Sequence, residues 1–194
     1  MQHYIQQQIE EAHRITALMR NDTALNTALA SAAQAVIHSL RADGKVLFAG
    51  NGGSAADAQH MAGEFVSRFM FDRPGLAAVA LTTDTSILTA IGNDYGYEKL
   101  FERQVQALGR KGDVLVVYST SGKSPNILRA LEAARAKGLV TIGFTGNRGG
   151  PMHELCDHVL ATPSADTPKI QEGHLIMGHI LCGLVERTMF TPPA

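Results

Sequence analysis

The chain has 194 residues, of which 17 are Lys or Arg and 18 are Asp or Glu. A chain of this length can bury a core without disulfides or a structural metal, and its near-neutral charge excludes the basic surface of a typical nucleic-acid binder. The amino terminus lacks the apolar stretch of a signal peptide, and no apolar run approaches the roughly 18 residues of a membrane span. We therefore expect one domain over residues 1–194, in the cytoplasm, that acts on small molecules and binds neither nucleic acid nor membrane.

The amino-terminal residues predict two helices, divided near Asn21 and Asp22. From Tyr4 to Arg41 the chain has neither glycine nor proline, and its aliphatic residues recur at helical spacing. We expect these helices to form a hairpin. Their apolar stripe is larger than one small sheet needs for cover, so we expect residues 1–42 to contribute to an interface between subunits.

Short apolar runs alternate with helical patterns along the rest of the chain. The runs are hydrophobic throughout, which is typical of strands buried on both faces of a parallel sheet. The expected strands cover residues 46–49, 77–81, 114–118 and 140–144, with 159–161 as a shorter edge strand. The expected helices cover residues 54–70, 85–91, 98–108, 124–137 and 169–189. This order of elements predicts an α/β fold with a mostly parallel five-stranded sheet.

Three loops that follow predicted strands are candidates for a functional site. In open α/β sheets, ligands bind outside the carboxyl ends of the strands, near the point where the strand order reverses. The loops at those ends cover residues 51–54, 82–84 and 119–124, and all three are rich in hydroxyl and amide groups. We therefore expect a polar ligand to bind at this edge of the sheet.

The loop at residues 119–124 has the composition of a phosphate cradle. Ser124 is a favourable N-cap, and Pro125 occupies the favoured first position of the following helix. Four hydroxyl groups and the free N–H groups of that helix would form a neutral cradle, and the helix dipole also favours an anion. The loop is not a P-loop, because the pattern GxxxxGK[ST] is absent. On this loop alone, a connection whose only role is to cap the helix fits equally well.

Four side chains on two predicted helices form a candidate metal site. His60 and Glu64 are four residues apart and share one helical face. Gln171 and His179 are about 80° apart around an ideal helix, whereas His174 is about 140° from His179. Two imidazoles, a carboxylate and an amide oxygen are a plausible ligand set for zinc.

Each of these residues also has an ordinary structural interpretation. Taken singly, His60 fits a partly buried helix residue, Glu64 a solvated carboxylate and His179 a core histidine. The amide of Gln171 could equally cap a loop or bind a sugar hydroxyl. The grouping of all four residues with the polar loops favours metal binding over these alternatives.

Five segments together resemble the sugar isomerase (SIS) domain family. They are Asn51-Gly-Gly-Ser-Ala-Ala-Asp-Ala-Gln-His60, Leu81-Thr-Thr-Asp84, Ala90-Ile-Gly-Asn-Asp-Tyr-Gly96, Ser119-Thr-Ser-Gly-Lys-Ser-Pro-Asn126 and Ile170-Gln-Glu-Gly-His174. Within that family, the set is similar to the phosphoheptose isomerases over nearly the whole chain. The resemblance implies a three-layer sandwich of flavodoxin-like type and a homotetramer with active sites at subunit boundaries. It also implies interconversion of sedoheptulose 7-phosphate and D-glycero-D-manno-heptose 7-phosphate, the first step of ADP- or GDP-heptose synthesis for lipopolysaccharide or capsule.

The resemblance also implies roles for individual residues. One Zn²⁺ per subunit would be bound by His60, Glu64, Gln171 and His179. The phosphate would be held by Ser119, Thr120, Ser121 and Ser124. The sugar would be contacted by Asn51, Gly52, Gly53, Ser54, Glu64, Asn93, Asp94 and Gln171. Our hypothesis is that zinc polarises the sugar oxygens while Glu64 and His179 exchange protons with the substrate, with Glu64 favoured over His179 as the carbon base.

A second interpretation is a non-catalytic SIS-domain binding protein of the DnaA-initiator-associating type. Such a protein shares the sheet and much of the loop sequence but acts through protein contacts, and it lacks the equivalents of Glu64 and His179. Because both residues are present in this chain, we favour the enzyme. The roles of three further residues stay open. Asp57 and Asp84 are unassigned, although Asp57 fits stabilisation of the first turn of its helix, and Arg68 fits either a phosphate contact from a neighbouring subunit or a surface ion pair.

Overall fold

The computed structural model describes residues 1–147 and 149–191; residues 148 and 192–194 of the predicted domain lie outside this part. Its centre is a five-stranded sheet in the order β2-β1-β3-β4-β5, and every neighbouring pair of strands is parallel. The strands are β1 (Val46–Gly50), β2 (Ala78–Ala80), β3 (Val114–Tyr118), β4 (Val140–Gly146) and β5 (His158–Thr162). This strand order is that of flavodoxin-like sheets, so the predicted fold class is confirmed.

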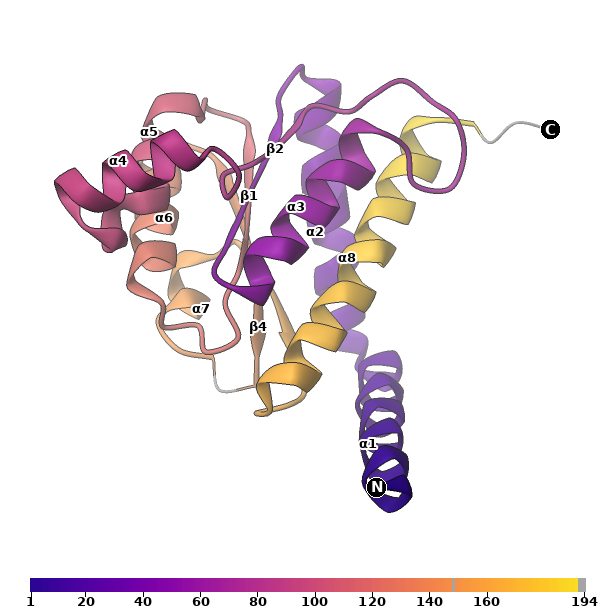
Figure 1. The fold of residues 1–194 in the computed structure, drawn as a ribbon. Helices are drawn as coiled ribbons and strands as arrows, with labels where there is room; N and C mark the ends of the chain where they lie inside the picture. Colours follow the sequence, from indigo (N-terminus) through magenta and orange to yellow (C-terminus); the bar gives the residue numbers. More distant parts are fainter. Residues whose placement is uncertain (148, 192–194) are drawn as a thin grey trace.

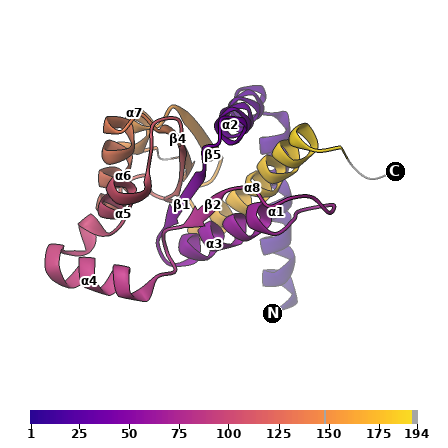
Figure 2. The same ribbon diagram turned by 90° about the horizontal axis from the view of Figure 1, so that it is seen from above.

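Helices cover both faces of the sheet and complete a three-layer arrangement (Figures 1 and 2). After α1 (Gln2–Asn21), one layer contains α2 (Thr23–Arg41), α3 (Gly53–Val66) and α8 (Thr167–Met189). The other contains α4 (Thr85–Tyr95), the short 3-10 helix η1 (Tyr97–Lys99), α5 (Leu100–Leu108), α6 (Pro125–Ala136) and α7 (Met152–Leu155). The short α7 is not anticipated by the sequence pattern. Within the described ranges, none of the helices combines the length and hydrophobicity needed to span a membrane.

The alternation of side chains along the strands builds a core on each face of the sheet. Phe48, Tyr118 and Phe144 belong to the cluster that packs against α2, α3 and α8, whereas Leu47 and Leu115 belong to the cluster against α5 and α6. β1 and β3 are buried along their whole length, as expected from their uninterrupted apolar sequences. β2 and β5 form the two edges, which confirms the predicted edge strand near the carboxyl end.

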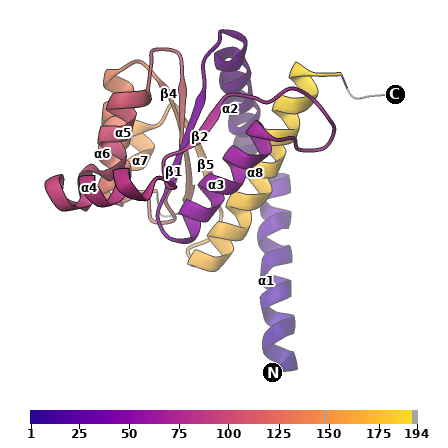
Figure 3. The ribbon, with the colours of Figure 1, turned by 45° about the horizontal axis from the view of Figure 1, so that its top comes forward.

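The two predicted amino-terminal helices are present, but they do not fold back on each other as a hairpin. They are separated only by Asp22, whose side chain caps α2 by accepting a hydrogen bond from Leu25 N (2.9 Å). This single residue is shorter than the roughly two- to five-residue turn of a helical hairpin. α2 therefore continues onward from the end of α1, and α1 projects beyond the sheet (Figures 1 and 3). The projecting helix exposes Tyr4, Ile5 and Ile9.

α3 ends at Val66, four residues earlier than predicted. The chain then turns back, and Leu76 N donates a hydrogen bond to Phe65 O (3.0 Å). The guanidinium of Arg73 also donates to the carbonyl oxygens of Glu64 (2.7 Å) and Phe65 (2.6 Å). These donors satisfy carbonyls in the last turn of α3, so the helix ends without a further turn.

α4 continues to Tyr95, four residues beyond its predicted end. It stops at Gly96, which has a positive φ of 86°. Glycine adopts this left-handed conformation without the strain that a side chain would add, and such a residue ends a helix. Asn93 and Asp94 therefore lie in the last turn of a helix.

Candidate active site

The loops after β1 and β3 lie at the reversal point of the sheet. These two strands are neighbours, and the chain leaves β1 toward the edge strand β2 but leaves β3 toward β4 on the other side. Open α/β sheets bind ligands outside the carboxyl ends of strands at such a point. α3 begins directly after the β1 loop, and α8 begins at the same end of the sheet (Figure 1). Two of the three predicted loops therefore border one site.

Three of the predicted metal ligands converge between α3 and α8. His60 Nε2 lies 2.9 Å from Glu64 Oε1, one turn further along α3. The ring of His179, on α8, has its centroid 5.1 Å from that of His60, at an interplanar angle of 81°. One possible ligand atom from each of the three residues lies within 4.8 Å of the other two. We call these three residues the metal cluster.

The donor set of the metal cluster fits zinc. Imidazole nitrogens and carboxylate oxygens are common zinc ligands, and catalytic zinc sites use about three protein ligands with one position left for water or substrate. The side chain of His60 is 43% exposed and that of Glu64 is 23% exposed, so solvent reaches one side of the cluster. An ion held here would therefore be accessible to a substrate oxygen.

Gln171, the fourth predicted ligand, lies about two turns before His179 on α8. Its amide packs against the start of α3, where a Cβ atom at Gly53 would come within 2.6 Å of Gln171 Nε2. Glycine at residue 53 therefore makes room for the amide. Through this contact α8 reaches the β1 loop as well as the metal cluster.

Two other titratable side chains on these helices have different environments. Asp57 lies in the second turn of α3, so the structure does not support the alternative that it stabilises the first turn. Burial raises the pKa of Asp57, and the nearby His60 opposes that shift. His174 is fully buried, its Nε2 lies 3.1 Å from Thr145 O, and burial lowers its pKa to about 4. As its helical spacing predicts, His174 is not a member of the cluster found among the described residues.

The loop after β3 is folded tightly by its own backbone. Gly122 has a φ of 64°, and its N–H donates to Ser119 O (3.1 Å). A Cβ atom at Gly122 would collide with Gly149 O, so the turn requires glycine. The hydroxyl oxygens of Ser119 and Ser124 lie 3.2 Å apart. Ser124 occupies the N-cap of α6 as predicted, but within the described chain its hydroxyl makes no capping hydrogen bond.

Pro125 has no N–H and Ile127 N–H donates to Ser124 O (3.0 Å), so in the described part of the chain the backbone donor at the start of α6 that is left for an anion is Asn126 N–H. The first N–H groups of a helix have no intrahelical partner, and they favour negative charge. Thr120, Ser121 and Lys123 line a cavity of about 270 Å³ together with Thr167 and Ile170 at the start of α8. The loop thus places hydroxyl groups beside a cavity of suitable size for a phosphate.

Asn51 connects the two loops. Asn126 Nδ2 donates to Asn51 Oδ1 (2.8 Å), and Asn51 Nδ2 donates to Asn126 Oδ1 (2.9 Å). The hydroxyl of Tyr97 also donates to Asn51 Oδ1 (2.9 Å). These three residues and Ser124 border a cavity of about 470 Å³. Because Oδ1 already accepts two hydrogen bonds, Asn51 can offer a sugar only its amide nitrogen.

The sequence matches known proteins along nearly its whole length. Residues 10–146 match the family model described as SIS domain. The chain is 71% identical over 187 residues to a phosphoheptose isomerase of Burkholderia pseudomallei (strain 1710b), and the match covers 96% of this chain and 95% of that protein. The chain belongs to the phosphoheptose isomerases of the SIS domain family.

Solved structures of phosphoheptose isomerases have the same fold. The chain resembles phosphoheptose isomerase GmhA from Neisseria gonorrhoeae with a TM-score of 0.88 at 43% identity. It resembles a phosphoheptose isomerase from Francisella tularensis with a TM-score of 0.91 at 38% identity. Both matches cover 95% of this chain and 97% of the other. Membership of this family makes the chain an enzyme of the sugar-phosphate isomerase class.

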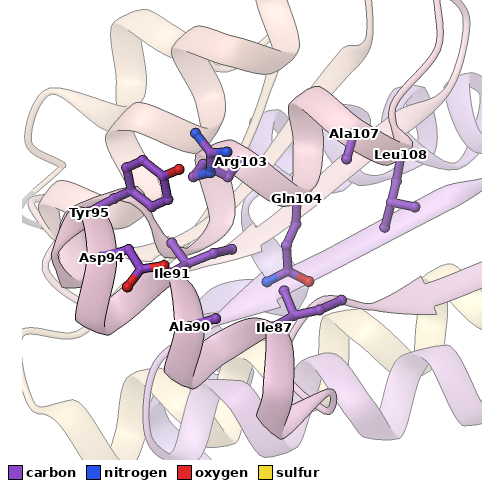
Figure 4. A pocket seen from close by; sticks show the side chains of 9 residues that line it. All are labelled: Ile87, Ala90, Ile91, Asp94, Tyr95, Arg103, Gln104, Ala107 and Leu108. Carbon is purple, nitrogen blue, oxygen red and sulfur yellow. The ribbon is translucent and has the colours of Figure 1, made fainter.

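Two predicted substrate contacts of this isomerase lie on α4, in the other helical layer. Asn93 Nδ2 donates to Asp94 Oδ1 (2.8 Å). Asp94 borders an apolar cavity of about 400 Å³ between α4 and α5, where the guanidinium of Arg103 lies 3.9 Å from the ring centroid of Tyr95 (Figure 4). Among the described residues, no hydrogen bond joins Asn93 or Asp94 to the two loops or to the metal cluster.

The third predicted loop uses its polar groups to support the backbone. Asp84 caps α4 by accepting a hydrogen bond from Ile87 N (2.9 Å). The hydroxyl of Thr83 donates to Ala80 O (3.3 Å). This loop therefore has a structural role, and the role of Asp84 is to cap α4.

Ser54 and Arg68 differ in their exposure to solvent. Ser54, a predicted sugar contact, is buried beside the β1 loop, where its N–H donates to Asn51 O (3.0 Å). Arg68 is exposed in the segment after α3. Its exposure is compatible with both of the roles expected from the sequence.

Two residues of the site, Tyr97 and Asn126, are not identified by the sequence patterns. Asn126 is a polar residue in the first turn of the helix after the hydroxyl loop, and this position is a signal that could have been used. Tyr97 gives no such signal, because its partner Asn51 is 46 residues away in the chain. Only the fold brings these groups together.

Proposed function

We propose that the chain interconverts sedoheptulose 7-phosphate and D-glycero-D-manno-heptose 7-phosphate, a ketose–aldose isomerisation. The observation that carries the proposal is the convergence of His60, Glu64 and His179 from α3 and α8, the two helices that begin at the end of the sheet where the polar loops lie. This reaction moves a proton between neighbouring carbons, so it needs a base, an acid and stabilisation of the enediolate oxygens. The similarity to a relative named phosphoheptose isomerase supports a heptose phosphate as the substrate.

Zinc is the proposed cofactor, with one ion per subunit. His60, Glu64 and His179 would hold the ion, and Gln171 would be the fourth ligand. When bound, the ion would act as a Lewis acid toward the oxygens at C1 and C2 of the sugar. An amide is an uncommon zinc ligand, and the Gln171 side chain already packs against Gly53. Gln171 is therefore the proposed ligand that most readily gives way to a substrate oxygen.

Glu64 and His179 are the proposed acid–base pair. A carboxylate has two oxygens and an imidazole has two nitrogens, so each group can hold a proton at one atom while its other atom is occupied. Glu64 would remove the proton from carbon, and His179 would move a proton at the sugar oxygens. In the reverse reaction the same groups return these protons.

The phosphate is proposed to bind against the loop after β3. The hydroxyl groups of Ser119, Thr120, Ser121 and Ser124 are its proposed donors. The cavity of about 270 Å³ lined by Thr120 and Ser121 supports this placement, as does the turn at Gly122. The backbone N–H of Asn126 at the start of α6 would add to the attraction for a dianion.

The proposed active form is a homotetramer with its sites at subunit boundaries. α1 exposes Tyr4, Ile5 and Ile9, a surface that a second copy would cover. In such an assembly Asn93 and Asp94 of one subunit would contact the sugar bound by its neighbour. The product is proposed to supply heptose for lipopolysaccharide or capsule precursors in the cytoplasm.

The proposal is tested by following the formation of aldoheptose 7-phosphate from sedoheptulose 7-phosphate by NMR. The purified chain is assayed as prepared, after chelation and after return of Zn²⁺. Loss of turnover on chelation and its recovery with zinc would support both the reaction and the cofactor. Turnover that is indifferent to chelation would support the isomerase but contradict the zinc role. Absence of turnover in the zinc-loaded protein would contradict the proposal and favour the binding-protein interpretation.

A further inference from the structure

A buried ion pair connects the two helices that carry the metal cluster. Arg73 lies in the segment between α3 and β2, and Glu186 lies on α8. Arg73 Nε is 3.2 Å from Glu186 Oε1, and the two side chains are only 3% and 1% exposed. A charged pair at this depth is costly unless its remaining polar atoms are also paired. The hydrogen-bond partners of Arg73 and Glu186 indicate which parts of the chain the ion pair holds in place.

The guanidinium of Arg73 holds the end of α3. Nη2 donates to Glu64 O (2.7 Å), and Nη1 donates to Phe65 O (2.6 Å). Nη1 also lies 3.1 Å from Ser67 O and 3.1 Å from Pro74 O. The last carbonyl groups of a helix carry partial negative charge, so a cation is favourable there. Because one of these carbonyl groups belongs to Glu64, Arg73 fixes the backbone from which the proposed base projects.

The carboxylate of Glu186 holds the segment after α3 against α8. Oε1 accepts a hydrogen bond from Phe69 N (2.9 Å), and Oε2 accepts one from Met70 N (2.8 Å). Burial raises the pKa of Glu186, but these two N–H donors and Arg73 outweigh burial and hold that pKa below its usual value. The centroid of the Phe69 ring lies 5.6 Å from that of His179. Glu186 follows His179 by seven residues, so both side chains leave α8 on nearly the same face.

We propose that Arg73 and Glu186 are positioning residues that set the spacing of α3 and α8 at the metal cluster. This inference rests on the proposed function, because it concerns the proposed metal ligands. Glu64 comes from α3 and His179 from α8, so the cluster forms at only one separation of the two helices. The ion pair acts on Glu64 through its carbonyl group and on His179 through the segment that carries Phe69.

Two conservative substitutions loosen this connection without opening a cavity. The planar guanidinium of Arg73 binds a carboxylate and several carbonyl groups at once, and a lysine ammonium cannot reproduce that geometry. Arg73→Lys therefore keeps the positive charge at the end of α3 but loses part of its hydrogen bonding. Glu186→Gln keeps the size of the side chain but replaces one oxygen with an NH₂ group. Because each oxygen of Glu186 accepts a hydrogen bond from a backbone N–H, this NH₂ group would face another donor.

The test uses Co²⁺ as the probe in the full-length chain. The measurements are the visible absorption spectrum of the Co²⁺-loaded protein, the Co²⁺ affinity by competition with a chelator, and the thermal unfolding of the metal-free chain. We expect Arg73→Lys and Glu186→Gln to change the spectrum and to weaken Co²⁺ binding by about 10–100-fold, as for partners that orient metal ligands. The matched control is the exposed pair of Glu11 and Arg14, 2.6 Å apart, in which Arg14→Lys and Glu11→Gln should leave both readouts unchanged.

An unchanged Co²⁺ spectrum and affinity in the folded variants would overturn the positioning role. That outcome, accompanied by a lower unfolding temperature of the metal-free chain, would mean that the pair only stabilises the fold. If Arg73→Lys fails to fold, Glu186→Gln decides the question. Failure of the wild-type chain to bind Co²⁺ would instead contradict the proposed metal site, so the two proposals fail in distinguishable ways.

Discussion

The loop after β3 and the metal cluster between α3 and α8 are the two parts of the proposed site, and they are held by different kinds of contact. In the loop, backbone hydrogen bonds fix the geometry: Gly122 N–H donates to Ser119 O (3.1 Å), and Gly146 N–H donates to Thr120 O (3.2 Å). In the cluster, His60 and His179 come from helices that are far apart in the chain and meet only through tertiary packing. The loop therefore depends on backbone hydrogen bonds, whereas the cluster depends on how two helices are spaced.

We expect this difference to separate substrate binding from proton transfer. The loop offers hydroxyl and N–H donors, which can hold an anion but do not titrate near neutral pH. The cluster offers imidazole and carboxylate groups, which can exchange protons with a substrate. We therefore expect changes in the loop to act mainly on KM, and changes in the cluster to act mainly on kcat.

Removal of the proposed base should have the largest effect on turnover. Glu64→Gln keeps the size of the side chain but removes its ability to accept a proton, so kcat should fall by about 10²–10⁴-fold. His179→Gln should cost at least about 100-fold for the same reason. Steady-state kinetics with sedoheptulose 7-phosphate measure both effects, with the exposed Glu132→Gln on α6 as the matched control. Near-normal turnover in either cluster variant would remove that residue from the acid–base pair.

The two histidines of α8 provide a second contrast, because His174 is fully buried whereas His179 is only partly buried. The pKa of His174 is lowered from 6.5 to about 4 by burial, so between these values the unfolded chain binds more protons than the folded chain. Stability is therefore lost as the pH falls from about 6.5 toward about 4, by about 3 kcal/mol in total. His174→Gln should remove this part of the pH dependence. Urea unfolding at pH 7 and pH 5 measures the free energy of unfolding, and an unchanged difference between the two pH values would contradict the assignment.

A hydroxyl of the loop should affect binding more than turnover. Ser121→Ala removes one proposed donor to the phosphate, and a hydrogen bond to a charged group contributes about 1.5–3 kcal/mol, so KM should rise by about 10–100-fold. The inhibition constant of inorganic phosphate should rise in parallel. Ser31→Ala, on the exposed face of α2, is the control. A large fall in kcat with an unchanged KM would reverse the proposed division between the loop and the cluster.

The smallest effect should come from the contact between Tyr97 and Asn51. Tyr97→Phe removes the hydroxyl that donates to Asn51 Oδ1 (2.9 Å). A neutral hydrogen bond contributes about 0.5–1.5 kcal/mol, so we expect KM to rise about two- to tenfold with little change in kcat. The same kinetics on Glu132→Gln, which alters an exposed residue of α6, give the control. A greater effect on kcat than on KM would group Tyr97 with the cluster.

Features that depend on neighbouring residues in the chain were predictable from the sequence. Uninterrupted apolar runs predicted the buried strands β1 and β3, and Ser124-Pro125 predicted the start of α6. The four-residue spacing of His60 and Glu64 predicted that they share a helical face, and they lie 2.9 Å apart. The predicted hairpin was wrong because the single residue Asp22 between α1 and α2 is too short for a turn.

Features that depend on distant residues were not predictable in this way. The end of α3 is determined by Arg73, whose partner Glu186 is 113 residues away in the chain. Asn51 and Asn126 are 75 residues apart, and no periodic pattern links them. Gln171 was chosen through resemblance to a family, since spacing alone left its role open. The sequence therefore predicted the parts of the site but not the long-range contacts that fix their relative positions.

A crystal structure of the chain with Zn²⁺ and sedoheptulose 7-phosphate, with diffraction data collected on both sides of the zinc absorption edge, tests the central claim most directly. We predict an anomalous zinc peak between His60, Glu64 and His179, and phosphate density against the loop of residues 119–124. Phosphate bound at the cluster, or a zinc peak elsewhere with no metal between these three side chains, would contradict the division of the site into a chemical cluster and a binding loop.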